Sequence, residues 1–257
     1  MLAHVKAPIG AICAVALCTM WFVAASAPVT GATPDDDDKA IAASLATMLG
    51  AGRTVISRNQ DLINNPEIED KGLSGKAVLE QAVKVYQEET NSDPLKVDQS
   101  TRHGRLLHIQ MDAIVEVMEA HQKTLNQRGV AFKGFVPAIF GRLVNETFGK
   151  GAANNAEMKV TAPLDLIRNR KSRPDAWETE VIRDKLLAAN WVKGQLFATV
   201  AKSKGKDAFR VAIPEYYAAS CLTCHGNPKG QVDITGYPKE GASEGDLGGV
   251  ISITLYR

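Results

Sequence analysis

The feature that most limits what this chain can be is one short motif near its C-terminus, Cys221-Leu222-Thr223-Cys224-His225. Two thiols three positions apart can bond to the two vinyl groups of one haem, while the adjacent imidazole binds the iron from the same turn. A chain of this composition would contain the pattern by chance about once in a thousand cases. We therefore expect one covalent haem c, with thioether bonds from Cys221 and Cys224 and His225 as the proximal iron ligand.

Three other uses of the motif compete with haem. A disulfide between Cys221 and Cys224 fits an oxidising compartment but leaves His225 unexplained. A thiol-redox pair is expected near the start of a βαβ unit, whereas this motif stands near the C-terminus. A zinc site needs a second pair of ligands with similar spacing, and the sequence does not contain one. Haem c is the interpretation that uses all three side chains.

The N-terminus predicts export. A short, weakly basic start is followed by an uncharged apolar run over residues 9–25, and small residues at 25–27 suit a signal peptidase. We expect residues 1–27 to be a signal peptide, with an uncleaved membrane anchor as the alternative. Either arrangement places the remainder in the periplasm, where haem c is attached in bacteria. Removal of the leader takes away Cys13 and Cys18, which leaves Cys221 and Cys224.

Charge and length narrow the class of protein further. The chain has 257 residues, with 30 Lys and Arg against 29 Asp and Glu. A chain without an excess of positive charge lacks the field that attracts nucleic acid, so we expect no nucleic-acid partner. Its length suits one large domain or two small ones.

The spacing of apolar residues predicts a mixed fold. We expect a helical region over 28–128 and a haem domain over 129–257, in which strands and helices alternate unevenly. Hairpin-like strand pairs favour an α+β class with an antiparallel sheet. The expected helices are 39–49 with a continuation at 53–63, 74–91, 106–125, 137–148 and 176–187. The expected strands are 130–135, 157–161, 196–200, 208–213 and 249–255.

Haem brings two propionates and a flat apolar ring, and the chain offers groups for both. Arg168, Arg170 and Arg173 form a basic cluster that can bind the propionates, or that can remain a solvated loop. Three phenylalanines can line the haem pocket, or can simply fill the core. They are Phe132, Phe135 and Phe140. The sixth iron position has several candidate donors, namely Met48, Met111, Met118, Met158, His103, His108 and His121.

Several segments around the motif resemble the Tll0287-like haem-domain family. The resemblance is carried by residues 132–137, 168–170, 174–178, 215–220, 226–230, 233–241 and 244–249, together with the motif. It implies a PAS-like antiparallel sheet with flanking helices that carries one c-type haem and senses redox state or a small ligand. A member of the family has a distal cysteine thiolate, which this chain lacks once its leader is removed. Because the distal donor of the family comes from an N-terminal helix, we expect Met48 to take that role here.

The sequence thus predicts an exported mono-haem c-type protein with a PAS-like domain that senses redox state or a small ligand. A simple periplasmic electron-transfer cytochrome is the alternative. We expect no enzymatic activity. A peroxidase-type enzyme is a third alternative, which needs an open iron site and a distal acid-base pair, and no His-Arg pair is evident from the sequence. The expected partner is a redox or signalling protein, and the N-terminal segment could tether the chain to a membrane.

Overall fold

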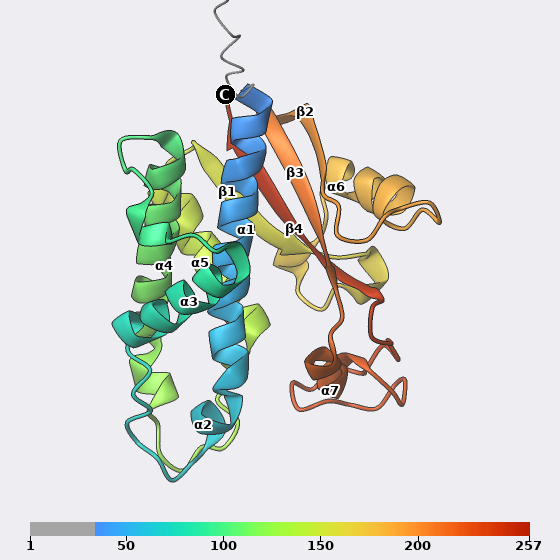
Figure 1. Cartoon of the computed structure of the whole chain (residues 1–257). Coiled ribbons are helices and arrows are strands. Elements are labelled where there is room, and N and C mark those ends of the chain that lie inside the picture. Colours follow the sequence, from blue (N-terminus) through green and yellow to red (C-terminus); the bar gives the residue numbers. More distant parts are fainter. Residues whose placement is uncertain (1–33) are drawn as a thin grey trace, which may run out of the picture. The chain divides into compact units, whose positions relative to one another are not determined.

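Four antiparallel strands form the sheet, which we describe from a computed structural model for residues 34–257. They are β1 (Ala156–Thr161), β2 (Phe197–Ser203), β3 (Lys206–Tyr216) and β4 (Leu247–Tyr256). Their spatial order is β1-β4-β3-β2 (Figure 1). β2 and β3 form the expected hairpin, and the long connection from β3 to β4 carries the Cys-His motif. The predicted α+β class with an antiparallel sheet is confirmed.

Seven helices accompany the sheet within residues 34–257. Four long ones gather on one side of it, and α1 contacts the other three as well as β3 and β4 (Figure 1). Three helices are short: α2 follows α1 closely, and α6 and α7 come later in the chain. The helices are α1 (Pro34–Arg58), α2 (Gln60–Asn64), α3 (Gly75–Thr90), α4 (Arg102–Leu125), α5 (Pro137–Gly151), α6 (Ala176–Val181) and α7 (Leu222–His225).

Local capping explains where the helices begin. Ser74 accepts a hydrogen bond from the Ala77 amide at the start of α3, which satisfies a free N–H of the first turn. Asp175 and Glu178 form a reciprocal capping box at α6. The helix expected over 176–187 continues past α6 as a π-helical turn, Ile182–Leu186.

Two predictions need correction. The helices expected at 39–49 and 53–63 are one continuous helix, α1, followed by the short α2. The strand expected at 130–135 is a loop. Gly129 and Gly134 there have φ values of 75° and 68°, which break an extended strand, and the Lys133 amide donates to the Asn64 side chain instead of to a neighbouring strand.

The main core lies between the sheet and the long helices. Alternate residues of β3 and β4, including Phe209, Val211, Ile251 and Ile253, pack against these helices. The opposite face is different. Ala212 and Val250 form a smaller apolar cluster with α6 and the π-helical turn, while Arg210, Ser252 and Thr254 are buried polar residues. The sheet therefore has one apolar face and one partly polar face.

α1 is also the single helix in residues 34–257 that is long and apolar enough, by length and composition, to cross a membrane. In its most apolar window, 61% is buried inside the protein, so packing against the core accounts for its apolar character. Its start is fixed by Asp38, whose carboxylate pairs with Arg102 at 2.9 Å and Arg257 at 3.1 Å. The predicted signal peptide, residues 1–27, lies outside the described residues.

Substitution of the buried Phe140 tests the core between the helices and the sheet. Phe140 is fully buried on α5, and its ring packs edge-on against Phe135 at 6.1 Å between centroids. We expect Phe140→Ala to lower the free energy of unfolding by about 3–5 kcal/mol, because it leaves a cavity. Leu164→Ala is the control, since Leu164 is 61% exposed and its loss should change stability by less than about 0.5 kcal/mol. Urea denaturation of both variants measures this, and equal effects would contradict the assigned core.

Candidate functional site

The Cys-His motif lies in an irregular segment that we call the motif loop, residues 217–246, between β3 and β4. Backbone hydrogen bonds close this loop on itself. The Tyr217 amide donates to the Asp246 carbonyl at 2.9 Å, and the Ala242 amide donates to the His225 carbonyl at 2.8 Å. The loop forms a separate lobe beside the lower ends of the helices (Figure 1). Its fixed backbone holds the motif in one place.

The three side chains of the motif share one turn. A 3-10 turn (Ala219–Cys221) leads directly into α7, which ends at His225. Cys221, Cys224 and His225 are each half-buried, and both thiols are free. The structure therefore leaves the two sulfur atoms and the imidazole available for a ligand from outside the chain.

The orientation of His225 is set by a carboxylate. Its Nδ1 lies 2.9 Å from Oε2 of Glu240, and Arg168 holds Glu240 in turn through Nε at 2.8 Å and Nη2 at 3.0 Å. A carboxylate on one ring nitrogen fixes the tautomer and makes the other nitrogen a better donor to a metal. Burial alone would raise the pKa of Glu240, but Arg168 and then His225 hold it below its usual range. Glu240 thus stays ionised, and the Nε2 of His225 remains free for iron.

Arg168 also anchors the far side of the motif loop. Its Nη1 donates to Asp233 at 2.7 Å, and its Nη2 donates to the Cys224 carbonyl at 2.9 Å. The Asp233 side chain is 1% exposed and accepts further bonds from the amide and hydroxyl of Thr235. Burial would raise the pKa of Asp233, but the bonds from Thr235 and Arg168 lower it well below its usual range. One guanidinium therefore holds two carboxylates of the loop, Asp233 and Glu240.

The ring of Tyr217 fixes the plane of the imidazole. It stacks on His225 with centroids 4.9 Å apart, and the two planes differ by 26°. Burial, followed by the charge of Glu240, raises the pKa of Tyr217 to about 12, so its hydroxyl stays protonated. Gly248 lies against the Tyr217 ring and has no room for a side chain, because a Cβ there would lie 2.5 Å from the ring.

The chemistry of the thiols bears on the competing uses of the motif. Burial, and then the nearby charge of Asp233, raises the pKa of the Cys224 thiol. Redox-active cysteines show the opposite change, since catalysis needs the thiolate. Residues 34–257 also contain no cluster of three or more His, Cys, Asp or Glu side chains arranged to hold a metal ion. These observations favour a ligand that needs two thiols and one imidazole.

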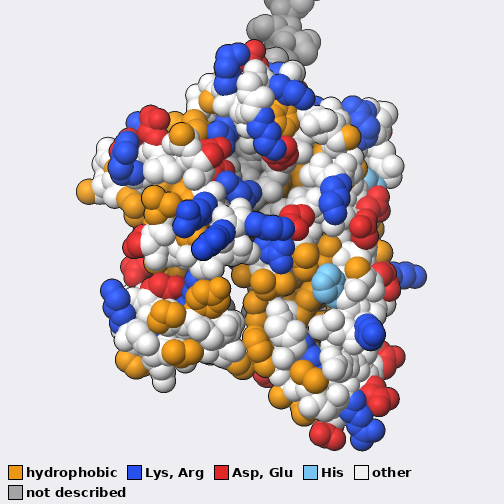
Figure 2. All heavy atoms as spheres, turned by 180° about the vertical axis from the view of Figure 1, so that it is seen from behind, with side chains coloured by type: hydrophobic (Ala, Val, Ile, Leu, Met, Phe, Trp, Pro, Cys, Tyr) orange, Lys and Arg blue, Asp and Glu red, His pale blue; other side chains and the backbone are white. Residues whose placement is uncertain are grey.

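The surroundings of the motif suit a flat apolar ligand. Figure 2 shows a gap between the lobe of the motif loop and the lower ends of the helices, with hydrophobic side chains gathered along it. A haem ring buries large apolar faces, so such a surface stabilises it. The residues present therefore fit a haem: two free thiols, an imidazole oriented through Nδ1 and an apolar wall.

Comparison with known proteins agrees with this geometry. Residues 95–255 match the model of the Tll0287-like family, which is well over half of the chain. The chain belongs to the Tll0287-like family. This family is associated with haem binding. Searches of curated proteins and of solved structures each found no significant match.

In this Tll0287-like protein, the structure shows what one of the three predicted propionate-binding arginines, Arg168, contacts. Arg168 is a structural residue of the motif loop, because its guanidinium pairs with Asp233 and Glu240. Arg170 and Arg173 are exposed on a neighbouring turn. Contact of all three with haem propionates stays a prediction.

The predicted pocket phenylalanines divide into two groups. Phe135 and Phe140 are buried members of the main core, and Phe132 is half-buried. Met48, the predicted distal ligand, is fully buried on α1 in the same core. Its sulfur would have to be uncovered to reach an iron, so its role also stays a prediction. His121 is only half-buried and is therefore more accessible than Met48. Its Nδ1 lies 2.7 Å from the Val117 carbonyl, so Nε2 is the ring nitrogen that this contact does not use.

The sequence alone gives no role to Asp233, Glu240 or Tyr217. A signal for the carboxylates was present, since histidine ligands generally use their second nitrogen on a carboxylate or carbonyl. Asp233 and Glu240 are the first two acidic residues after His225. Their pairing with a distant arginine had no sequence signal, because it depends on how the chain folds back.

The Asp233–Arg168 pair predicts a specific response to acid. A carboxyl group whose folded pKa is lowered stabilises the fold above its unfolded pKa, about 3.9, and this contribution is lost as the pH falls toward the folded value. We expect Asp233→Asn to lower the free energy of unfolding at pH 7 by about 1–3 kcal/mol. The difference from wild type should shrink between pH 5 and pH 2.

Urea denaturation across this pH range measures the effect. Asp207→Asn is the matched control, because Asp207 forms an exposed pair with Lys202. It should change stability by less than about 0.5 kcal/mol. A constant difference between Asp233→Asn and wild type at all pH values would contradict the assigned ion pair.

Proposed function

We propose that this chain is an exported mono-haem c-type protein that senses redox state or a small ligand. The observation that carries the proposal is the arrangement of the motif, in which two free thiols share a turn with an imidazole whose Nδ1 is held by Glu240. Membership of the Tll0287-like family supports a haem. The uncharged N-terminal run supports export, as argued from the sequence.

Each residue of the motif has a defined task in this proposal. Cys221 and Cys224 would hold a haem through thioether bonds, since each S–H can add across one vinyl group with its proton passing to the adjacent carbon. His225 would offer Nε2 to the iron, while Glu240 accepts a hydrogen bond from Nδ1. The bound haem would supply a one-electron couple and, where the sixth position opens, a site for a diatomic ligand.

The connection of the motif loop to the sheet supports a sensing role. Tyr217 touches His225 and directly follows the end of β3, so movement of the imidazole reaches the sheet through one side chain. Two residues earlier, Glu215 pairs with Arg53 of α1 at 2.5 Å. These contacts offer a route by which a change at the haem alters the surface presented to a redox or signalling partner.

A plain electron carrier is the second candidate. It is favoured by the partial exposure of the motif, since His225 is 29% exposed and both cysteines are half-buried. An accessible haem edge is sufficient for electron transfer to a partner protein. Optical spectra of oxidised and reduced protein, with and without CO, separate the two. Rapid CO binding by the wild type favours the sensor, and a closed six-coordinate iron favours the carrier.

Covalent attachment is the first prediction of the proposal. Protein matured with the cytochrome c assembly machinery should keep its pigment through acid-acetone extraction. Cys221→Ala and Cys224→Ala should each leave one thioether and lower the yield of holoprotein, whereas Ser220→Ala, a change beside the motif, should not. Complete extraction of haem from the wild type would end the proposal.

The distal ligand is the second prediction. If Met48 binds iron, oxidised protein should show a weak sulfur-to-iron band in the far red, and Met48→Leu should remove that band and make CO bind more readily. Leucine conserves volume, so the change should cost less than about 1.5 kcal/mol of stability. Met118→Leu is the matched control, because Met118 is equally buried on α4. An unchanged Met48→Leu spectrum would exclude Met48 and make His121 the next donor to test.

A further inference from the structure

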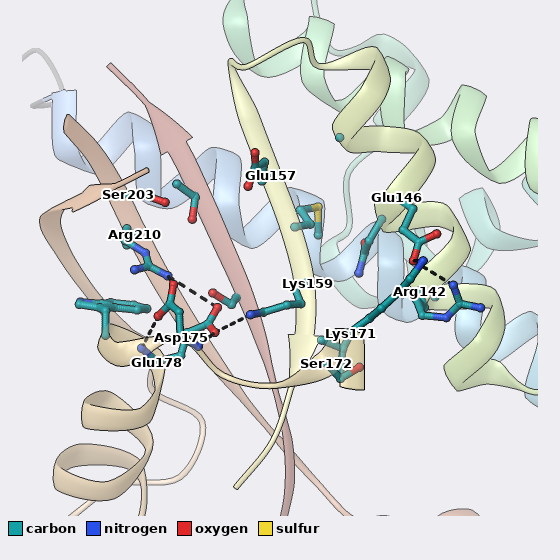
Figure 3. A pocket seen from close by; sticks show the side chains of 18 of the residues that line it. Arg142, Glu146, Glu157, Lys159, Lys171, Ser172, Asp175, Glu178, Ser203 and Arg210 are labelled. Carbon is teal, nitrogen blue, oxygen red and sulfur yellow. Dashed lines mark hydrogen bonds and ion pairs between the residues drawn. The ribbon is translucent and has the colours of Figure 1, made fainter. Parts of the chain in front are cut away.

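A second pocket, separate from the motif loop, lies over the edge strand β1. It extends from α5 and the turn Arg170–Ser172 on one side of β1 to α6 on the other (Figure 3). Its volume of about 1020 Å³ is large enough for a small organic molecule. Among the described residues that line it, none belongs to the Cys-His motif. We call this pocket the β1 cleft.

The β1 cleft exists because α5 turns an unusual face toward it. This face carries Ala138, Gly141 and Gly149 in place of large apolar side chains. A Cβ added to Gly149 would meet no atom within 4 Å, whereas one added to Gly141 would lie 3.0 Å from the side chain of Arg53. Between these small residues stand Arg142 and Asn145. A helix packed beside a sheet normally fills such a face with apolar groups, so this one leaves space and presents polar atoms to it.

The buried side-chain amide of Asn145, which lines the cleft, makes no hydrogen bond within the described residues. Its residue is 5% exposed, and neither Oδ1 nor Nδ2 has a hydrogen-bond partner among residues 34–257. The Nε atoms of Arg142 and Arg53, which also line the cleft, are buried without a partner as well. An unsatisfied buried amide costs about 1–3 kcal/mol, and native proteins generally satisfy such groups with a protein partner or ordered water. A bound ligand can supply the same hydrogen bonds.

The charges around the cleft favour an anion. Of the described lining residues, eight are Lys or Arg and four are Asp or Glu. Two of these cations, Arg53 and Lys202, pair with carboxylates outside the lining, so the excess is smaller than the count suggests. Figure 2 shows basic side chains gathered around a hollow on this face of the molecule. Positive charge in excess of its acidic partners attracts an anionic ligand into a concave surface.

The excess is located at the α5 end of the cleft. There Glu146 Oε1 accepts bonds from both Arg142 Nη1 at 2.9 Å and Lys171 Nζ at 3.0 Å, so one carboxylate serves two cations. Across β1 the charges balance: Lys159 pairs with Glu178 at 2.7 Å, and Arg210 pairs with Asp175 at 2.7 Å (Figure 3). The uncompensated charge therefore lies beside the unpartnered amide of Asn145.

We propose that the β1 cleft binds a small organic acid, whose carboxylate is held by Arg142, Lys171 and the amide of Asn145. The carboxylate supplies the second negative charge that Arg142 and Lys171 lack, and it accepts a hydrogen bond from Asn145 Nδ2. Asn145 Oδ1 then receives a hydroxyl or amino hydrogen of the same ligand. This inference does not depend on the haem, because no residue of the motif takes part.

The test measures binding to the full chain at constant ionic strength set with sodium chloride. The probes are acetate, succinate, citrate and inorganic phosphate. Their binding is measured by isothermal titration calorimetry and by the shift in the midpoint of thermal unfolding. We expect citrate, the one probe with a hydroxyl hydrogen for Asn145 Oδ1, to bind with a 1:1 stoichiometry and to raise the unfolding temperature, as a ligand that binds the folded state must. Phosphate should bind more weakly than that carboxylate.

Variants then locate the site. Arg142→Gln should weaken binding of that carboxylate at least about tenfold, since a charge-assisted bond is lost. Asn145→Leu should also weaken binding, yet it should leave the ligand-free protein as stable as wild type or more stable, because it removes two unsatisfied polar atoms. A purely structural Asn145 would give the opposite effect on stability. Lys96→Gln, at an exposed site outside the cleft, is the control and should bind like wild type.

Three results would overturn the proposal. One is that none of the three carboxylates binds at about 10 mM, a concentration tenfold above a weak dissociation constant of about 1 mM. Another is binding that remains the same in Arg142→Gln and Asn145→Leu. The third is a preference for phosphate over every carboxylate, which would make the cleft a phosphate site. Because these variants leave the motif unchanged, their haem content also shows whether the haem proposal stands independently.

Discussion

Arg168 is the side chain on which the order of the motif loop depends. The loop contains little regular structure and contributes no large buried cluster of its own, so its shape relies on polar contacts. The guanidinium joins Asp233, Glu240 and the Cys224 carbonyl, which come from three different stretches of the loop. It lies largely out of water, where each charge-assisted bond counts for more than on the surface. Through Glu240, it also sets the orientation of His225.

The sheet connects the two parts of the molecule that we assign to ligands. β3 ends next to Tyr217, which stacks on His225, while β1 and the polar face of β4 border the cleft. Arg53 lines the cleft and pairs with Glu215 near the end of β3. The Arg53–Glu215 pair therefore joins the cleft to the end of β3 that carries the motif loop.

Much of the fold could be predicted from local sequence pattern. The β2–β3 hairpin follows from two β-prone runs around Lys204 and Gly205, and the start of α3 follows from the Ser74 cap. The strand expected at 130–135 was wrong because β-prone residues there are flanked by glycines with positive φ. For the site, the motif itself was visible, whereas the role of Arg168 was not, since a basic cluster has the same sequence appearance whether it binds a ligand or a carboxylate.

The sequence by itself determined the chemistry at the motif, because the spacing of Cys221, Cys224 and His225 is local and places three donors on one turn whatever the remaining fold. Only the tertiary structure decided what surrounds them. Glu240 stands 15 residues from His225, and Arg168 stands 72 residues from Glu240, so their contact requires the chain to return past the sheet. The β1 cleft likewise brings α5 against an edge strand and a later turn. Hydrogen bonds and charge pairs of this kind depend on distance in space, which residue spacing along the chain does not encode.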